Sequence, residues 1–407
     1  MMLLSRMRYI DDTVGMFICN VLGQIIRLKN IFLRRTRDIP YDKVRVIVCQ
    51  KYFGMGSILH SIPLIRALRV RYPNARIIFL TLESQREVVE LCGIADEVLT
   101  IRLDSFGVLI KDALTRIFYL LRQGVDISVD LEFFSKFTLL VSLLTMARIR
   151  IGLYKNKIRP EGVITHEIYY NPYKHISEIY FAYALSLGIM RRPEYFAAPL
   201  PSLKYTLSKP LFNKFALNHS SPLVIVNVNS SNLFKFRCWP ADYFVRLLKL
   251  FINDYPNCHY ILVGDDKDTD YVEAICRKVE RPSQLINLAG KTSIRELFAL
   301  IEIADLVITN DSGPLHIASL YQKNLVVFFG PETPLVYGPL NENSLVFYSS
   351  DLYCSPCLSV YDSKKALFGE NCLINTCLVS IQPEDVYERI KQRFLKQLAL
   401  IPAHKGQ

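Results

Sequence analysis

The segment VITNDSGPLHIAS, residues 307–319, passes from an apolar run through a short polar turn into a helical pattern. Pro314 suits the first turn of a helix, because the N–H that proline lacks has no partner there. A helix start offers free backbone N–H groups and the positive end of the helix dipole, so this turn predicts an anion-binding site. Capping of the helix is the alternative role for its aspartate. The expected members of the site are Asp311, Ser312, Gly313 and His316.

A second polar segment, NVNSSNLFKFRCWP at residues 227–240, follows another apolar run. Lys235 and Arg237 precede Trp239, the only tryptophan of the chain. A guanidinium group matches the oxygens of phosphate, so this segment predicts phosphate binding at the end of a strand. The alternative is a solvated loop whose tryptophan fills the core. The candidate residues are Asn229, Ser230, Ser231 and Arg237.

A third segment, FFGPETPLVYGP at residues 328–339, again places Gly-Pro at the end of an apolar run. Glu332, Thr333 and Pro334 are expected to open the helix that follows. Two such strand ends in the same half of the chain predict a site for two neighbouring phosphates, as in a nucleotide diphosphate.

The segment QKYFGMGSILHS, residues 50–61, places Gly54 and Gly56 between an apolar run and a helical pattern. These glycines, with Glu83 at the end of the next apolar run, partly match the dinucleotide-binding fingerprint. Leu59 occupies the place of the third glycine, so the fingerprint is incomplete. The alternative is that the two glycines simply allow a tight turn from strand to helix.

Four late cysteines follow the pattern C-x₂-C-x₁₄-C-x₄-C, which is close to the spacing of structural zinc sites. The second pair is wider than usual and no histidine contributes. Free thiols or a labile disulfide are therefore the alternatives to zinc. The four residues are Cys354, Cys357, Cys372 and Cys377.

Short apolar runs alternate with helical patterns along the chain, which predicts βαβ units and parallel sheets. The prolines of residues 192–222 indicate a linker between two such halves. We therefore expect an α/β fold of two Rossmann-like, doubly wound domains facing each other across a cleft, with ligands beyond the carboxyl ends of the strands. The expected strands are 43–49, 76–82, 95–101, 125–131, 148–154, 223–228, 259–264, 304–309 and 324–329, and the expected helices are 57–72, 105–123, 133–146, 241–254, 268–280, 292–303 and one from 383 onward.

The chain has 407 residues, of which 51% are hydrophobic, and a formal net charge of +11. Positive charge suits phosphates or an anionic membrane, whereas nucleic acid is disfavoured because the chain has no RNP motif, zinc-finger histidines or arginine-rich helix. No apolar stretch is long enough to span a membrane. Residues 1–39 combine an apolar run with basic residues, which predicts an amphipathic segment on an anionic membrane surface. A helix packed on the domain or a loose leader is the alternative.

The motifs described above also occur together in one known family. The stretches GMGSILHSIPLIRALRVRYPNARI, RCWPADYF, LAGKTSIRELFALIEIADLVITNDSGPLHIAS, FFGPETPLVYGPL and CSPC follow one another between about residues 43 and 395. In this order they resemble glycosyltransferase family 9, the family of the bacterial lipopolysaccharide heptosyltransferases. The resemblance implies a GT-B fold made of the basic segment 1–39, an acceptor-side domain at 40–200, a nucleotide-sugar-binding domain at 201–382 and a C-terminal helix at 383–407 that packs back toward the first domain.

The same resemblance implies a transfer with inversion that requires no cofactor and no catalytic metal. The donor would be a nucleotide-diphosphate sugar, and the acceptor a lipopolysaccharide core or another lipid-linked glycan at the cytoplasmic face of the bacterial inner membrane. Arg237 would hold the diphosphate, the turn at 311–316 the donor sugar and phosphates, and the loop with Gly54 and Gly56 would face the acceptor. Inversion needs a base on one face of the anomeric carbon and charge stabilisation of the leaving diphosphate on the other.

One position departs from the family pattern, which has Gly-Asp in the first loop with the aspartate as the base. This chain has Ser57 there, and a serine hydroxyl alone is a poor base. The acceptor can need little deprotonation, or the chain can bind nucleotide sugars or glycans without catalysis. A dinucleotide-dependent oxidoreductase is a further alternative, disfavoured by the incomplete fingerprint. If the base comes from elsewhere, the candidates are Asp130, Glu132, His60 and Glu83.

Overall fold

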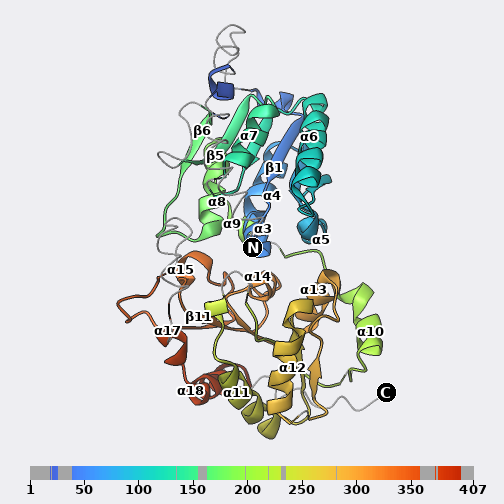
Figure 1. The fold of residues 1–407 in the computed structure, drawn as a ribbon, viewed down its shortest axis with the longest axis vertical. Helices are drawn as coiled ribbons and strands as arrows, with labels where there is room; N and C mark the ends of the chain where they lie inside the picture. Colours follow the sequence, from blue (N-terminus) through green and yellow to red (C-terminus); the bar gives the residue numbers. More distant parts are fainter. Residues whose placement is uncertain are drawn as a thin grey trace. The chain divides into compact units, whose positions relative to one another are not determined.

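A computed structural model gives the fold (Figure 1). It describes residues 19, 21–25, 39–133, 135–154, 163–197, 199–218, 220–230, 235–280, 282–357, 372 and 375–395. The chain divides into two compact units, Met1–Ala198 and Pro199–Gln407. This division lies close to the predicted domain boundary at residue 200. The predicted basic segment at 1–39 lies almost entirely outside the described residues.

The first unit contains a six-stranded parallel sheet with the order β3-β2-β1-β4-β5-β6. The chain winds outward from β1 in one direction and then from β4 in the other, so the switch point of the sheet lies between these two strands. Gln50 at the end of β1 is in register with Asp130 at the end of β4. The strands are β1 (Val46–Gln50), β2 (Arg76–Leu82), β3 (Glu97–Ile101), β4 (Ile127–Asp130), β5 (Ile149–Tyr154) and β6 (His166–Tyr169).

Helices surround this sheet, and two of them correct the sequence-based prediction. The single helix expected at 57–72 is two helices that meet at Ser61, because Pro63 in the first turn of the second helix has no N–H to continue the first one. The long helix at 106–123 begins at the cap Ser105 and ends at Gly124, whose φ is +68°. The helices are α3 (Met55–His60), α4 (Ile62–Arg71), α5 (Arg86–Cys92), α6 (Phe106–Gln123), α7 (Lys136–Leu144), α8 (Ile176–Leu185) and α9 (Pro193–Ala197).

The second unit repeats the plan with the strand order β12-β11-β10-β7-β8-β9, again with all neighbours parallel. Its switch point lies between β7 and β10. The four strands predicted in this half are confirmed, whereas the short strand β9 and the edge strand β12 were not predicted. The strands are β7 (Leu223–Asn227), β8 (His259–Val263), β9 (Leu285–Asn287), β10 (Leu306–Asn310), β11 (Leu325–Phe329) and β12 (Ser344–Tyr348).

The stretch at 192–222, which the sequence predicts as a linker, includes the division between the two units and also contains helices. That stretch contains α9 and α10, and Lys214 at the end of α10 pairs with Glu296 at 2.7 Å. Pro193 begins a helix here rather than marking a loop, which is compatible with proline in a first turn. The helices are α10 (Lys204–Lys214), α11 (Ala241–Asp254), α12 (Thr269–Lys278), α13 (Ile294–Ile303), α14 (Gly313–Leu320), α15 (Pro334–Tyr337), α17 (Thr376–Val379) and α18 (Pro383–Ile390).

The last helix packs against its own unit over the described residues. Val386 and Ile390 are buried in the core of the second unit, and Glu384 pairs with Arg246 of α11 at 2.6 Å. Whether this helix also reaches the first domain stays a prediction. In the part of the chain that the structure describes, no helix has the length and apolar character needed to cross a membrane.

Candidate functional site

The turn at the end of β10 is held by hydrogen bonds from the neighbouring strand β7. Asn227 Nδ2 donates to Ser312 Oγ at 2.8 Å and to Thr309 Oγ1 at 3.1 Å, so the two strand ends at the switch point are linked. Ser312 is the N-cap residue of α14, but no side chain among the described residues caps this helix start. Pro314 has no N–H, and the N–H of Leu315 donates to the carbonyl of Ser312 at 3.2 Å, so this helix start offers an anion the N–H of Gly313 and the positive end of the helix dipole.

Asp311 does not cap the helix, which removes the alternative role for this residue. Its Oδ2 lies 3.3 Å from Nη1 of Arg237, and both side chains are largely buried. Burial raises the pKa of Asp311, and the positive charge of Arg237 opposes that rise. The structure thus brings together two residues that are far apart in sequence and that the sequence had placed separately at an anion site.

Trp239 fixes the segment that carries Arg237. Its ring stacks on Phe328 with 4.3 Å between the centroids, its backbone N–H donates to Asn310 Oδ1 at 2.8 Å, and Nε1 donates to the carbonyl of Ile381. The tryptophan does fill the core, as the alternative interpretation held. Its burial also positions the arginine two residues earlier, so the two interpretations of this segment are compatible.

Glu332 joins this group from the end of β11. The residue is 3% exposed, and its Oε1 accepts a hydrogen bond from the N–H of Thr333 at 3.2 Å. Its Oε2 has no hydrogen-bond partner among the described residues. Burial raises the pKa of Glu332 to about 8, Arg237 lowers it and Asp311 raises it, so the three charges act on one another. The sequence placed Glu332 only at a helix start and gave no signal for this role.

The second predicted anion-binding site, at the start of α15, is capped by a side chain. The hydroxyl of Thr333 accepts a hydrogen bond from the N–H of Leu335 at 3.2 Å and so caps this four-residue helix. A side chain therefore already satisfies the donor that a phosphate would have used. The strand end contributes a carboxyl group, Glu332, instead.

The remaining predicted donor-site residues have structural partners or lie outside the description. Asn229 donates to the carbonyl of Val263 at 2.9 Å and so links β7 to β8. Ser230 accepts a hydrogen bond from Cys238 Sγ at 3.1 Å. His316 is buried on α14, the helix that Asp311 precedes. Ser231 lies outside the described residues.

In the first unit, Glu132 holds the glycine loop from the end of β4. It accepts hydrogen bonds from the backbone N–H groups of Tyr52 and Phe53 at 2.6 and 2.9 Å, and its other oxygen pairs with Lys51 Nζ at 2.8 Å. Lys51 and Glu132 are both buried. Gly54 follows with a φ of +86°, a conformation that glycine adopts without strain. The loop conformation is thus fixed by a carboxylate that lies 80 residues away from Tyr52.

The other candidate bases are also engaged. Asp130 accepts hydrogen bonds from the N–H of Glu132 at 3.1 Å and from Thr138 Oγ1 at 2.9 Å. His60 is buried, and its ring meets the ring of His175 edge to face at 5.0 Å. Glu83 is half exposed and pairs with Arg86, which holds its pKa below the usual range. The structure therefore brings Asp130 and Glu132 to the same strand end and leaves Glu83 in a surface pair.

Ser57 lies in the first turn of α3, and its interaction with the hydroxyl of Tyr180 of α8 lowers the pKa of that tyrosine. The hydroxyl of Tyr180 also donates to the carbonyl of Leu131 at 3.4 Å, so this tyrosine connects Ser57 to the end of β4. Burial and the charge of Glu132 raise the pKa of Tyr180 well above its usual value. Sequence reasoning did not find Tyr180, because an aromatic residue on a helix is normally part of the core.

Comparison with known proteins decides the family. The family model described as Glycosyltransferase family 9 (heptosyltransferase) matches residues 140–367. The chain belongs to glycosyltransferase family 9. Lipooligosaccharide heptosyltransferase 2 of Campylobacter jejuni is 29% identical over 198 residues, which are 45% of this chain and 58% of that protein. The match therefore spans less than two thirds of the relative.

Solved structures show the fold of this family 9 chain. The structure of E. coli ADP-heptose lps heptosyltransferase II has a TM-score of 0.69 at 22% identity and covers 87% of this chain and 99% of that one. E. coli heptosyltransferase WaaC with ADP has a TM-score of 0.62 at 13% identity and covers 86% of this chain and 99% of that one. The fold is therefore GT-B, with two Rossmann-like α/β domains, as the sequence predicted.

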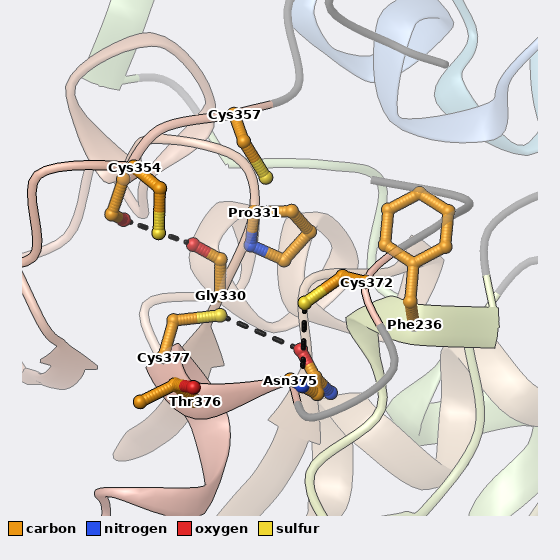
Figure 2. Close-up of a pocket in the computed structure, with 10 residues that line it drawn as sticks. Phe236, Gly330, Pro331, Cys354, Cys357, Cys372, Asn375, Thr376 and Cys377 are labelled. Carbon is orange, nitrogen blue, oxygen red and sulfur yellow. Dashed lines mark hydrogen bonds between the residues drawn. The ribbon is translucent and has the colours of Figure 1, made fainter. Parts of the chain in front are cut away.

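The four late cysteines of this family 9 chain line one small pocket together with Phe236 (Figure 2). Asn375 lies between two of them, because its N–H donates to Cys372 Sγ at 3.3 Å and its Oδ1 accepts from Cys377 Sγ at 3.5 Å. Burial raises the pKa of Cys377 to about 11, so its thiol is neutral. None of the cysteines forms a disulfide, and in the described part of the chain no group of three or more metal-binding side chains is arranged to hold a metal ion.

Proposed function

We propose that this family 9 chain transfers a heptose or a similar sugar from a nucleotide-diphosphate donor to a lipopolysaccharide core or another lipid-linked glycan. The observation that carries the proposal is the group at the end of β10, where Arg237, Asp311 and the uncapped start of α14 lie together. The names of the relatives support the choice of sugar, because they are heptosyltransferases and one was solved with ADP.

In this mechanism the second unit holds the donor. Arg237, the N–H of Gly313 and the positive end of α14 bind the diphosphate and stabilise the negative charge that develops as the sugar leaves. Asp311, held beside Arg237, contacts hydroxyl groups of the sugar as a hydrogen-bond acceptor. These groups supply the charge stabilisation that other transferases obtain from Mg²⁺, so we propose a transfer with inversion that needs no metal.

The first unit holds the acceptor in the same proposal. Asp130 and Glu132 are committed to fixed donors, so they position the loop that carries Gly54 and Gly56. Ser57, oriented by Tyr180, hydrogen-bonds the acceptor hydroxyl. Ser57→Ala is then expected to lower turnover of the acceptor and to leave donor affinity unchanged, which separates it from a residue of the donor site.

The alternative function is a relative that binds nucleotide sugars or glycans without transferring them, and Ser57 is the observation that favours it. The deciding assay mixes the purified chain with nucleotide sugars and membrane extract and follows release of nucleoside diphosphate. Donor binding without release from any nucleotide sugar contradicts the transferase. Release that requires the acceptor supports it.

We also propose that the chain works at an anionic membrane surface, where a lipid-linked acceptor is found. The predicted segment 1–39 is one contact, and α6 offers a second, because Lys111 and Arg122 flank an exposed apolar face on this helix. That face consists of Phe106, Ile110, Leu114, Phe118 and Leu121, which are 42–60% exposed.

Flotation with vesicles that contain anionic lipid tests the membrane contact. Leu114→Asp combined with Phe118→Asp is expected to reduce binding, as is deletion of residues 1–39. Met190→Asp, at an exposed position of the same unit outside the helix, is the control. Equal flotation of all variants contradicts the proposal and leaves the transfer reaction itself untouched.

A further inference from the structure

The donor site contains more negative than positive charge if all its groups are ionised. Arg237 supplies one guanidinium, whereas Asp311 and Glu332 supply two buried carboxyl groups, 4% and 3% exposed. Charges in a buried site interact several times more strongly than in water. A bound diphosphate would add further negative charge beside the same arginine. The site can therefore accept a diphosphate readily only if one carboxyl group is neutral.

Two buried glutamates of this chain show what each ionisation state requires. Glu132 accepts two backbone N–H bonds and pairs with Lys51, which suits a carboxylate. Glu332 receives one N–H bond, from Thr333, and its Oε2 has no partner among the described residues. A carboxylate with one donor is poorly compensated when buried, whereas a carboxylic acid has an O–H that can donate. The surroundings of Glu332 therefore fit the acid form.

We propose that Glu332 is a donor-binding residue that acts as a neutral carboxylic acid and donates a hydrogen bond through Oε2 to an oxygen of the bound donor diphosphate. This inference rests on the proposed function, because it assumes a nucleotide diphosphate beside Arg237. It assigns Glu332 a role in recognising the charge of the donor. Burial raises the pKa of Glu332 to about 8, which also favours the neutral acid.

The charged and titratable groups that act on Glu332 come from three segments. Arg237 lowers its pKa and Asp311 raises it. Glu332 also raises the pKa of Cys357, although burial raises it more, so the Cys357 thiol is neutral near pH 7. A bound diphosphate adds negative charge and therefore raises the pKa of Glu332 further. Binding above about pH 8 must then be accompanied by uptake of a proton, and affinity must fall as the pH rises.

Calorimetric titration with ADP tests the inference on the unmodified chain. ADP itself is fully ionised well above about pH 6, so its own titration does not interfere near pH 8. We expect the affinity for ADP to decrease above about pH 8 by up to about tenfold per pH unit. Titrations at one pH in buffers of different ionisation enthalpy are expected to show uptake of up to about one proton per ADP.

Glu332→Gln supplies the matched variant, because an amide keeps the shape and an N–H donor but cannot lose a proton. This variant is expected to bind ADP near pH 7 about as well as the unmodified chain, with little pH dependence and no proton uptake. Glu342→Gln removes the same charge at an exposed position of the second unit and is expected to keep the wild-type pH profile. Thermal unfolding checks that each variant is folded.

Two outcomes are distinguishable. If the unmodified chain binds ADP but shows the same flat pH profile as Glu332→Gln and takes up no proton, the assignment of Glu332 is wrong and the proposed function stands. If the chain binds neither ADP nor the diphosphates of the other nucleosides at any pH, the proposed function is wrong and this inference is wrong with it.

Discussion

Removal of the Glu132 carboxylate is expected to destabilise the first unit more than any surface change. Glu132→Ala leaves the ammonium of Lys51 buried without its partner, and it removes the acceptor for the N–H groups of Tyr52 and Phe53. Breaking a buried ion pair by removing one partner costs about 3–5 kcal/mol. The two lost backbone hydrogen bonds are not simply added, because water can enter the space left by the side chain.

The loss of stability should be much smaller when Lys51 is also replaced. Lys51→Met combined with Glu132→Gln removes both charges and keeps a carbonyl oxygen for the two backbone N–H groups. A buried ion pair replaced by groups of similar volume is often nearly neutral in stability. We therefore expect the double variant to lie within about 1–2 kcal/mol of the unmodified chain, far closer than Glu132→Ala.

Urea unfolding followed by two signals measures this difference. Trp239 lies in the second unit and is the only tryptophan, so its fluorescence reports that unit, whereas circular dichroism reports both. A loss of about 4 kcal/mol at a slope of about 2 kcal/mol per molar urea moves the midpoint of the first unit down by about 2 M. The fluorescence midpoint serves as the internal control and is expected to stay unchanged.

The reasoning is refuted if Glu132→Ala lowers the free energy of unfolding of the first unit by less than about 1 kcal/mol. The buried pair would then not be what holds the loop in place. A different result would change the role of the residue. If Glu132→Gln abolishes transfer while stability and donor affinity remain, Glu132 acts as the base rather than as a support.

Three further outcomes are expected. Arg237→Glu should weaken donor binding by about a hundredfold or more, because it removes a charge-assisted contact and adds repulsion. The control Arg277→Glu, at an exposed position of α12, should leave donor binding unchanged. An equal loss of binding in both variants would contradict the role of Arg237 in holding the diphosphate. The pKa of Glu332 is raised to about 8 in the folded state, so the proton on this residue stabilises the fold fully below about pH 4.5. The free energy of unfolding should therefore fall by up to about 4–5 kcal/mol as the pH rises to about 8. Unfolding measured over a series of pH values tests this, and Glu332→Gln should show a smaller dependence on pH. Transfer should persist after treatment with EDTA, and a loss of activity that zinc or magnesium restores would contradict a metal-independent reaction; elemental analysis of the same samples shows whether the cysteine pocket carries a metal.

Much of the fold follows from local sequence patterns. Buried strands such as β1 and β10 have β-branched residues at three of their five positions, which the sequence shows directly. The missed strands are short or lie at an edge, as β6 does, where the burial pattern is partial. The helix division at Ser61 depends on Pro63, two residues later, and a proline at that place also permits a continuous but kinked helix.

The site could be predicted only in part, for a physical reason. Residue type and position at a strand end indicated Arg237 and Asp311, but their pairing depends on a fold that joins residues far apart in sequence. Glu132 was suspected as a base because a carboxylate at a strand end looks reactive. Its actual partners, Lys51 and two backbone N–H groups, come from the loop that follows β1. The role of Glu332 depends on burial and on a missing partner, neither of which a sequence displays.

The hydrogen bond from Trp239 Nε1 to the carbonyl of Ile381 has a consequence for the order in which the chain folds on the ribosome. The first unit can close once α8 and α9 have emerged, because it ends at residue 198. The segment that carries Arg237 cannot reach its final position until residues 381–390 have been synthesised, about 150 residues later, at a time scale of about ten or more seconds. The second unit, with Arg237 and Asp311, is therefore the last part of the described chain to form, and a nascent chain halted before that point would have a complete first unit and an incomplete second one.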